Sequence, residues 1–386
     1  RGLALMGGRL RIGIIGCGGI SWHHVAGYRE LHYRGLEAFS VVACCDVARE
    51  RAEGRAREVG AFQGEVPRVY TSFEEMIAKE ELDAVDICLP HSLHHTVAIR
   101  CLEEGLHVII EKPLGITMRA ARRIIEAAEK HGRVLAVAEN YRRSPANRAI
   151  WWAVRQGLIG EPRIIVWQSA NWSPGVGGWR ANKYEVGGSW VFDGGVHLAD
   201  LDRYQTGREP VEVFAVTEIF EPVKGGVRVT VDDMTMAIIR YEGGVYAQWL
   251  WTSVAPARPL NVRIIYGSRG AIDDQALRVQ EDWGVREVRM GDLIGRMMAS
   301  LTPEERERFF PRGITDTFAT ELYDFYLAVT RGGRPEVDGW EAYRDMAVPL
   351  GFYESAVLGA PVKVKDVLEL RVEAYQGEIN EKLGIK

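Results

Sequence analysis

The stretch Arg9–Ser21, RLRIGIIGCGGIS, decides the fold of this chain of 386 residues. Its first half is apolar in the pattern of a buried strand, which then breaks at Gly16, Gly18 and Gly19. Residues 20–31 contain no proline and can continue as a helix. Glycines let a backbone approach a pyrophosphate, and the free N–H groups of a helix start attract its negative charge. The stretch therefore predicts a strand, turn and helix that hold a dinucleotide, although its last residue, a serine, replaces the usual Gly or Ala.

A carboxylate follows the next apolar run. Phe39–Cys45 ends in Asp46, which could accept hydrogen bonds from both hydroxyls of an adenosine ribose. Asp46 follows Gly16 by 30 residues rather than the usual 20 or so, so the first helix or its exit loop must be extended. Alternatively, Asp46 only caps the next helix. A carboxylate here repels a 2′-phosphate and favours NAD over NADP, although Arg49 and Arg51 lie close enough to weaken this preference.

Length and composition describe an ordinary globular protein of two domains, with 47% hydrophobic and 26% charged residues. A net charge of −5 gives no basis for binding nucleic acid or an anionic membrane. No stretch approaches the roughly 20 apolar residues that cross a bilayer, and the Leu3–Met6 run is too short for a signal peptide. The five cysteines form no Cys-x-x-Cys pair and predict buried thiols in a reducing compartment, which makes the cytoplasm the expected location.

Strands and helices alternate through the first third of the chain. Further strands are predicted at residues 69–70, 84–89, 106–110 and 134–138, with helices between them. This alternation is typical of α/β proteins with a doubly wound parallel sheet, here residues 1–139. Ligands of such sheets bind at the carboxyl ends of the strands. The chemistry is therefore expected in segments that directly follow strands, namely Pro90–His94, Glu111–Pro113 and Glu139–Arg142.

From residue 140 onward the pattern changes. Helices are predicted at 144–156, 187–204, 315–331 and 339–357, and strands at 164–172, 211–220, 227–241, 245–253, 261–266, 271–287 and 362–364. Strands and helices in this order predict an α+β domain over residues 140–386. The predicted sheet has a broad apolar and aromatic face. That face suggests oligomerisation through the sheet, although a further layer of chain could equally cover it.

Two groups of residues could transfer protons. Lys112 directly follows a strand, so partial burial at the ligand edge would lower its pKa toward neutrality; it could also be a surface lysine before a helix-starting proline. Asp193 and His197 are four residues apart on a predicted helix and share a face. A histidine can take a hydroxyl proton while hydride leaves the same carbon. The two glycines between them cost about 1 kcal/mol each in a helix, which suggests that something approaches the backbone closely.

Two alternatives to a catalytic role for this pair stay open, a structural role and a metal site. Asp193 and His197 could form a structural pair, and a metal site lacks an obvious further ligand at helical spacing. Aromatic side chains stack on sugar faces, and arginines bind hydroxyls or carboxylates. Such residues gather near the glycine-rich segment and predict a ring substrate, a monosaccharide or larger, although each could equally be core packing: Arg142, Trp172, Trp179, Arg180 and Tyr184.

These segments together resemble the Gfo/Idh/MocA oxidoreductases. The glycine turn, the Pro90…His94 pair, Glu111-Lys112-Pro113 and the segment ending Asp193-x-x-x-His197 occur in the family's order and spacing over nearly the whole chain. The resemblance implies a Rossmann domain followed by a domain with an open, mainly antiparallel sheet. It also implies NAD(P)-dependent hydride transfer with a hydroxyl of a sugar, glycoside or cyclic polyol, usually in a homodimer or homotetramer, without nucleic acid or membrane as a partner.

By this resemblance Lys112, Asp193 and His197 fall on catalytic positions, and no metal is implied. One of Lys112 and His197 would take the hydroxyl proton and the other would stabilise the oxygen. The cofactor would be lined by Gly16, Gly18, Gly19, Ile20, Asp46, Pro90, His91, His94, Glu111 and Lys112, with His91 standing where many relatives carry Asn. Two alternatives are a redox-neutral, NAD-dependent glycoside hydrolase and a non-catalytic NAD-binding sensor. A sensor has no need for the proton-transfer residues.

Overall fold

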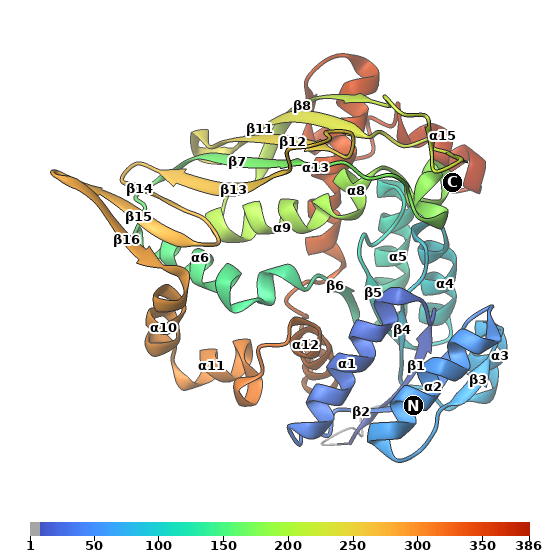
Figure 1. Cartoon of the computed structure of the whole chain (residues 1–386). Coiled ribbons are helices and arrows are strands. Elements are labelled where there is room, and N and C mark those ends of the chain that lie inside the picture. The colour runs from blue at the N-terminus through green and yellow to red at the C-terminus, as the bar shows by residue number, and fades with distance from the viewer. Residues whose placement is uncertain (1–7) are drawn as a thin grey trace. The chain divides into compact units, whose positions relative to one another are not determined.

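The computed structural model describes residues 8–386, so the Leu3–Met6 run lies outside the described part (Figure 1). By packing, the chain divides into two compact units. The first contains the chain up to Gly115, Ala120–Arg143 and Pro303–Ala342, and the second contains Ile116–Arg119, Ser144–Thr302 and Tyr343–Lys386. The functional division at residue 139 stays a prediction.

The first unit contains the predicted parallel sheet, which is confirmed. Its six strands pair in the order β3-β2-β1-β4-β5-β6, and every pair is parallel. The strands are β1 Leu10–Ile15, β2 Phe39–Cys45, β3 Arg68–Tyr70, β4 Ala84–Ile87, β5 His107–Glu111 and β6 Leu135–Ala138. The helices that alternate with them are α1 Gly19–Tyr33, α2 Arg49–Gln63, α3 Phe73–Lys79, α4 His91–Glu103 and α5 Met118–His131.

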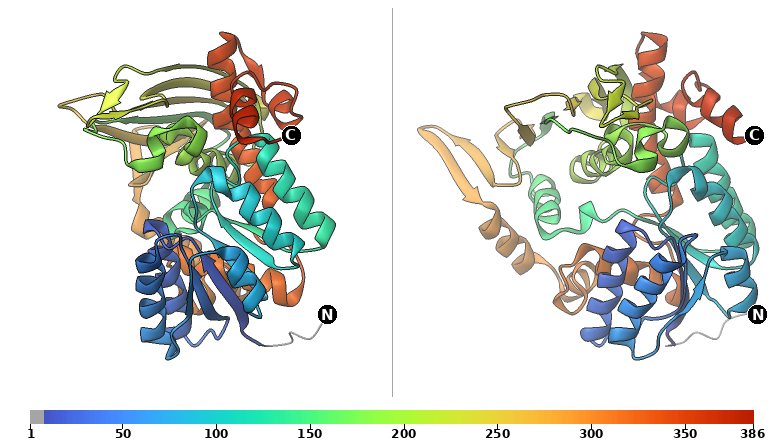
Figure 2. Two further views of the ribbon diagram at one scale, coloured as in Figure 1. Left: turned by 90° about the vertical axis from the view of Figure 1, so that its right-hand side faces the viewer. Right: turned by 45° about the vertical axis from the view of Figure 1, so that its right-hand side comes forward.

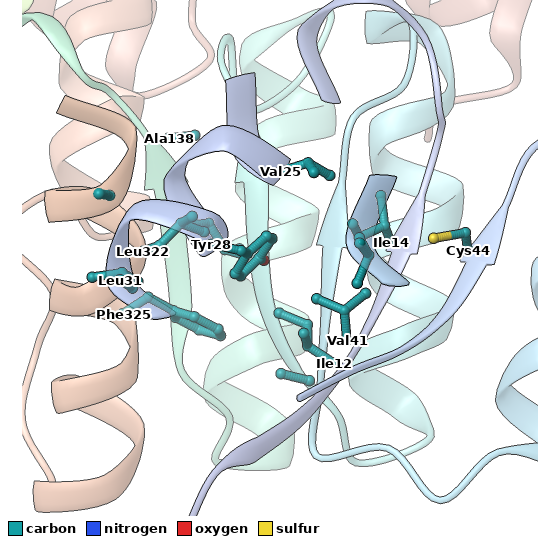
Figure 3. Close-up of a cluster of buried hydrophobic side chains, with 14 of the residues drawn as sticks. Ile12, Ile14, Val25, Tyr28, Leu31, Val41, Cys44, Ala138, Leu322 and Phe325 are labelled. Carbon is teal, nitrogen blue, oxygen red and sulfur yellow. The ribbon is translucent and has the colours of Figure 1, made fainter. Parts of the chain in front are cut away.

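A late helix completes the core of the first unit. The helix α12 (Thr317–Arg331) packs on α1, and Leu322 and Phe325 lie in one apolar cluster with Ile12, Ile14 and other side chains of the sheet and α1 (Figure 3). Close packing depends on a glycine, because a Cβ at Gly27 would lie 3.0 Å from the Ala319 nitrogen. This unit also contains α11 Pro303–Phe309, which the sequence did not predict.

The second unit contains the predicted open, mainly antiparallel sheet, which is also confirmed. Nine strands pair in the order β16-β15-β14-β13-β7-β12-β11-β8-β17, and only β7 and β12 run parallel within it. They are β7 Pro162–Ala170, β8 Pro210–Glu218, β11 Met234–Tyr241, β12 Tyr246–Thr252, β13 Leu260–Gly267, β14 Gly270–Ile272, β15 Ala276–Glu281, β16 Gly284–Arg289 and β17 Val362–Lys363. The short hairpin β9 Val223–Lys224 and β10 Val227–Arg228 forms a separate sheet.

Helices cover one face of this large sheet (Figure 1). Trp249 of β12 contacts α13 (Gly339–Leu358) through Phe352 and donates a hydrogen bond to Asp202 of α9 (Gly195–Thr206). Met236 and Ile238 of β11 point to the opposite, exposed face. The remaining helices of the unit are α6 Pro145–Arg155, α7 Lys183–Val186, α8 Trp190–Asp193, α10 Met290–Ser300, α14 Val364–Leu368 and α15 Gln376–Leu383. Among residues 8–386, no helix is long and apolar enough to span a bilayer.

Three sequence predictions about this unit were wrong in detail. The strand expected over 227–241 is two strands, β10 and β11, in different sheets. The single helix expected over 187–204 starts only after Ser189 and breaks at Gly194, so Asp193 ends α8 and His197 lies on α9. The single strand expected over 271–287 is three strands, of which β15 and β16 form a long hairpin (Figure 2). Periodicity marks apolar faces but does not show where a turn divides them.

Candidate active site

The glycine turn after β1 combines one tight position with two open ones. Gly16 has a φ of +93°, and a Cβ there would lie 2.2 Å from the Cys88 carbonyl oxygen, so only glycine fits. A Cβ at Gly18 or Gly19 would meet no atom within 4 Å. The first turn of α1 starts here and carries no acidic residue. Free backbone N–H groups and open space at this turn fit a pyrophosphate.

Asp46 lies beside that turn. Its Oδ2 accepts a hydrogen bond from the Cys17 nitrogen at 2.8 Å, and its Oδ1 accepts one from the Ala48 nitrogen at 2.8 Å. Ala48, not Asp46, is the N-cap of α2. A carboxylate offers about four acceptor sites, so Asp46 can support the loop and still bind ribose hydroxyls. Arg55, which sequence reasoning missed, donates to the Gly18 oxygen at 3.3 Å from α2.

A buried chain of charged groups leads from α1 to Lys112. Glu111 Oε2 accepts a hydrogen bond from the Lys112 nitrogen at 3.0 Å, and Glu111 Oε1 lies 3.0 Å from His24 Nε2. His24 Nδ1 lies 2.9 Å from Asp86 Oδ2. Burial works against a charged His24, but Asp86 outweighs it and raises the pKa of His24 well above 6.5. His24 therefore bridges two carboxylates and holds the end of β5 in place.

The same cluster contains side chains that can ligate a metal ion. Within residues 8–386, one group of potential ligands, His24, Asp86 and Cys88, brings its ligand atoms within 4.8 Å of one another. Both ring nitrogens of His24 face carboxylates, and Asp86 also accepts a hydrogen bond from the Tyr28 hydroxyl at 2.8 Å. A metal ion would have to replace these hydrogen bonds, so the geometry fits a hydrogen-bonded network better than a metal centre.

Histidines of α4 support the neighbouring loops. Pro90 is the N-cap of α4, and His91 is buried next to His94, with ring centroids 5.7 Å apart. His94 Nδ1 faces the Pro113 oxygen and its Nε2 faces the Leu89 oxygen, each at 2.9 Å. Burial lowers the pKa of His94 to about 4, so the neutral ring donates to one of these carbonyls. His94 thus ties together the loops that follow β4 and β5.

A cavity of about 440 Å³ lies entirely within the second unit. Asp193 and Arg180 line it, and Arg180 Nε donates to Asp193 Oδ2 at 2.6 Å. Two tryptophans contribute to its wall: Trp190 stacks on Trp251 with ring centroids 6.5 Å apart. Sequence reasoning missed several lining residues, namely Ser189, Trp190, Lys224, Asp232, Asp233 and Trp251. These residues come from four segments, and no local spacing connects them.

The glycines around Asp193 make room for the chain itself. A Cβ at Gly188 would lie 2.6 Å from the Tyr353 ring, and a Cβ at Gly194 would lie 2.3 Å from the Trp190 ring. Tyr353 also accepts a hydrogen bond from the Ser189 nitrogen at 2.9 Å and donates one to buried Asp232 at 2.8 Å. The close approach that the sequence suggested therefore comes from aromatic side chains, which hold the segment that carries Asp193.

The structure brings some of the predicted residues together and separates others. The ten expected cofactor residues belong to the first unit, as does Arg142, which is buried with a guanidinium nitrogen 3.9 Å from Glu341. The expectation that Arg142 lies in the substrate domain is not supported by packing. Ile20 is partly exposed beside the open glycines, and Lys112 is half-buried.

The remaining predicted residues belong to the second unit. His197 is buried but does not line the cavity. Of the expected substrate contacts only Arg180 lines it, because Trp172 is exposed and Trp179 packs under the Arg180 guanidinium at 4.4 Å. Tyr184 instead hydrogen-bonds Glu378.

Comparison with known proteins connects both units to one group. Residues 10–139 match a family described as oxidoreductase, NAD-binding Rossmann fold, and residues 147–273 match the GFO/IDH/MocA C-terminal domain. The 1,5-anhydro-D-fructose reductase of Ensifer adhaerens is 27% identical over 92% of this chain and 98% of that protein. An uncharacterised oxidoreductase of Rhizobium meliloti is 34% identical over 68% of this chain and 73% of its own. Levoglucosan dehydrogenase, solved with NADH and levoglucosan, has a TM-score of 0.76 at 25% identity and covers 92% of this chain and 99% of its own.

Proposed function

The chain belongs to the Gfo/Idh/MocA oxidoreductase family, and we propose on this premise that it transfers hydride between NAD and a hydroxyl of a sugar, glycoside or cyclic polyol. The observation that carries the proposal is a cavity with Asp193 and paired tryptophans in its wall, in a chain whose glycine turn fits a pyrophosphate. Stacked aromatics suit the faces of a sugar ring. The names of the relatives, a reductase of an anhydrofructose and a levoglucosan dehydrogenase, support the same class of substrate.

The cofactor would be held at the carboxyl edge of the parallel sheet. Gly18, Gly19 and the start of α1 would bind the pyrophosphate, and Asp46 would bind the adenosine ribose. Asp46 favours NAD over NADP, because its carboxylate repels a 2′-phosphate. The nicotinamide supplies a hydride acceptor when it is bound. Residues 1–139 would thus carry the cofactor and residues 140–386 the substrate.

Three side chains would act on the substrate hydroxyl during hydride transfer. His197 would take the proton of the substrate hydroxyl as a general base, and the ammonium of Lys112 would stabilise the developing negative oxygen. Asp193, which accepts a hydrogen bond from Arg180, would orient the hydroxyl. The roles of Lys112 and His197 can be exchanged, and the pH profiles of the two single variants would separate the possibilities.

We further propose a homodimer or homotetramer and a cytoplasmic location. The uncovered face of the large sheet carries a row of exposed apolar side chains that a second copy could bury, among them Phe214, Val216, Met236, Ile238 and Tyr246. All five cysteines are buried and free, as expected in a reducing compartment. Sedimentation of the purified chain tests the oligomer, and Ile238→Asp should dissociate it.

A screen of NAD reduction tests the proposed reaction. Free aldoses, inositols and glycosides are each offered with NAD and then with NADP, and the reduced cofactor is followed by absorbance. Formation of NADH with at least one sugar or polyol, faster than formation of NADPH, is expected. Release of an aglycone without net NADH would indicate redox-neutral glycoside hydrolysis instead. No turnover of any of these compounds would contradict the proposal.

A further inference from the structure

Lys224 is a buried charged group in the wall of the cavity with only one close hydrogen-bond partner in the described part of the chain. Its side chain is 1% exposed, and its Nζ donates a hydrogen bond to Ser253 Oγ at 2.8 Å. The nearest carboxylate oxygens, of Glu221 and Asp233, each lie 3.9 Å away, beyond hydrogen-bond reach. An ammonium has three N–H donors, so within residues 8–386 two of them have no hydrogen-bond acceptor. Buried donors are almost always paired, which indicates that a ligand completes this group.

Lys224 lies at the polar end of the cavity. Inward-facing side chains of β7 and its continuation change from Trp167 to Ser169, Asn171 and Ser173, and the last three line the cavity. The continuation still pairs with the extension of β12, because the Ser173 nitrogen donates to the Ser253 oxygen at 2.9 Å. At about 3.3 Å per residue, the polar row is roughly 13 Å long. One sugar ring stacked near the tryptophans would leave this row unfilled.

The charges around the cavity favour an uncharged occupant of the polar end. Arg180 is paired with Asp193, and Lys224 lies near two carboxylates, those of Glu221 and Asp233. Asp233 itself accepts hydrogen bonds from the Phe220 and Glu221 nitrogens at 2.9 Å. A carboxylate on the ligand would add a third negative charge beside one ammonium. A hydroxyl or ring oxygen accepts from the two free donors without that repulsion.

We infer that the cavity contains an outer subsite, built around Lys224 Nζ and Asn171, for a neutral hydroxylated group that is joined to the sugar being oxidised. The substrates would then be uncharged glycosides such as disaccharides, rather than free sugars or sugar acids. This inference rests on the proposed function for the position of the reacting ring near Asp193. It adds a specificity-determining residue, Lys224, which sits on the β9–β10 hairpin outside the predicted site.

The test compares matched pairs of substrates. NAD reduction is measured with D-glucose against cellobiose, with D-galactose against lactose, and with cellobiose against methyl β-D-glucuronide. At least one disaccharide should have a kcat/KM ten or more times that of its free sugar, and the glucuronide should be poorer than the disaccharide. In Lys224→Met, loss of hydrogen bonds to a charged donor should reduce the ratio of disaccharide to free sugar by about 10- to 100-fold. The reduction should appear mainly in KM.

Two further variants guard against a folding defect. Lys365→Met removes a lysine whose side chain is 73% exposed on α14, and it should leave the ratio unchanged. Asn171→Ala removes an exposed amide that makes no side-chain hydrogen bond among the described residues. It should lower the ratio about threefold to tenfold while the circular dichroism spectrum stays that of the wild type. If Lys224→Met does not fold, the Asn171→Ala result decides.

The outcomes separate this inference from the proposed function. If disaccharides and free sugars reduce NAD equally well in wild type, or if folded Lys224→Met keeps the wild-type ratio, the outer subsite is wrong while the reaction stands. If no sugar reduces NAD, calorimetric titration with cellobiose and lactose decides the subsite alone. Binding that weakens in Asn171→Ala would support it without the reaction, and absence of binding would overturn it too.

Discussion

The two glycine-rich segments of this chain look alike in sequence and have opposite uses. In Gly16–Gly19, added Cβ atoms at the second and third glycines would meet open space. In Gly187–Gly195, added Cβ atoms at Gly188 and Gly194 would strike Tyr353 and Trp190. The first segment leaves room for a ligand, whereas the second leaves room for the protein's own aromatic rings. A glycine cluster therefore predicts close approach but does not say what approaches.

The two segments also differ in what supports them. The helix after the first segment carries His24, which joins the carboxylates of Asp86 and Glu111 in a buried charged network. The second is held by Tyr353 and by Asp232, whose pKa is raised by burial. Five substitutions test this difference, beginning with the largest expected effect.

Lys112→Ala should lower the rate of the reaction without weakening the binding of the cofactor. Turnover should fall by about 10²–10⁴, the range for an acid–base group, while the dissociation constant of NAD stays within a few-fold of wild type. Steady-state kinetics and a fluorescence titration with NADH measure the two quantities. Lys130→Ala, at an exposed position of α5, is the control. Unchanged turnover would remove Lys112 from the mechanism.

His24→Gln should show that His24 is positively charged in the network with Asp86 and Glu111 that supports the first glycine segment. Leaving two buried carboxylates without their partner should cost about 3–5 kcal/mol of unfolding free energy. The pKa of His24 is raised in the folded chain, so its stabilisation is full below pH 6.5 and is lost as the pH rises through the raised value.

Melting temperatures measured from pH 6 to 10 should thus fall for wild type and fall less for His24→Gln. Glu321 shifts in the same sense from a lower pH, since burial raises its pKa well above 4.5. The charge of His24 lowers the pKa of Glu321, so the two proteins are compared in a Glu321→Gln background. Equal slopes in the two proteins would contradict a charged His24.

Gly194→Ala should damage the second segment through packing. The added Cβ would overlap the Trp190 ring at 2.3 Å, and overpacking of this kind costs about 1–3 kcal/mol. Urea denaturation should show the loss, and NADH affinity should be unchanged. A variant as stable as wild type would mean that Trp190 can move aside freely.

Gly18→Ala should weaken NADH binding more than it lowers stability, the reverse of Gly194→Ala. The added Cβ meets no atom of the chain and the φ of −76° suits alanine, but Gly18 is the N-cap of α1, where alanine is less favourable than glycine, so stability should fall by about 0.5–1 kcal/mol. NADH affinity should fall about tenfold, or ~1.4 kcal/mol, because the methyl group occupies the space for the pyrophosphate. Wild-type affinity would indicate that the cofactor does not approach this turn.

Gly54→Ala completes the series with the smallest effect. Gly54 lies inside α2, where an added Cβ meets nothing within 4 Å. Helix propensity should therefore raise the unfolding free energy by up to about 1 kcal/mol, without any change in NADH affinity or turnover. A loss of stability would show that open space near a glycine does not predict tolerance in this chain.

Sequence alone reached the parallel sheet and the glycine turn because both depend on local patterns. The alternation of Leu10, Ile12 and Ile14 and the conformation of Gly16 are properties of neighbouring residues. The start of α8 at Ser189 was missed because it depends on Tyr353, which lies far away in the sequence and accepts a hydrogen bond from the Ser189 nitrogen. Lys224 was missed for the same reason, since its burial comes from partners on other segments such as Ser253.

The candidate site also contains residues that local sequence patterns predicted and residues that depend on distant parts of the chain. Asp193 and Lys112 stand in recognisable segments, and their catalytic roles stay predictions. Arg180 was predicted from its residue type and does line the cavity, but Trp172 and Tyr184, chosen on the same grounds, do not. Residue type suggests which side chains could line a cavity, but the fold of the strands and loops decides which of them face it.

The position of α12 has a consequence for how this protein is made. Its side chains Leu322 and Phe325 belong to the core that β1 and α1 begin. A ribosome releases the N-terminal strands long before it reaches this helix, so the nascent sheet waits with apolar surface uncovered until most of the chain has emerged. Chaperone dependence during synthesis, and aggregation of fragments truncated before residue 303, would follow from that delay.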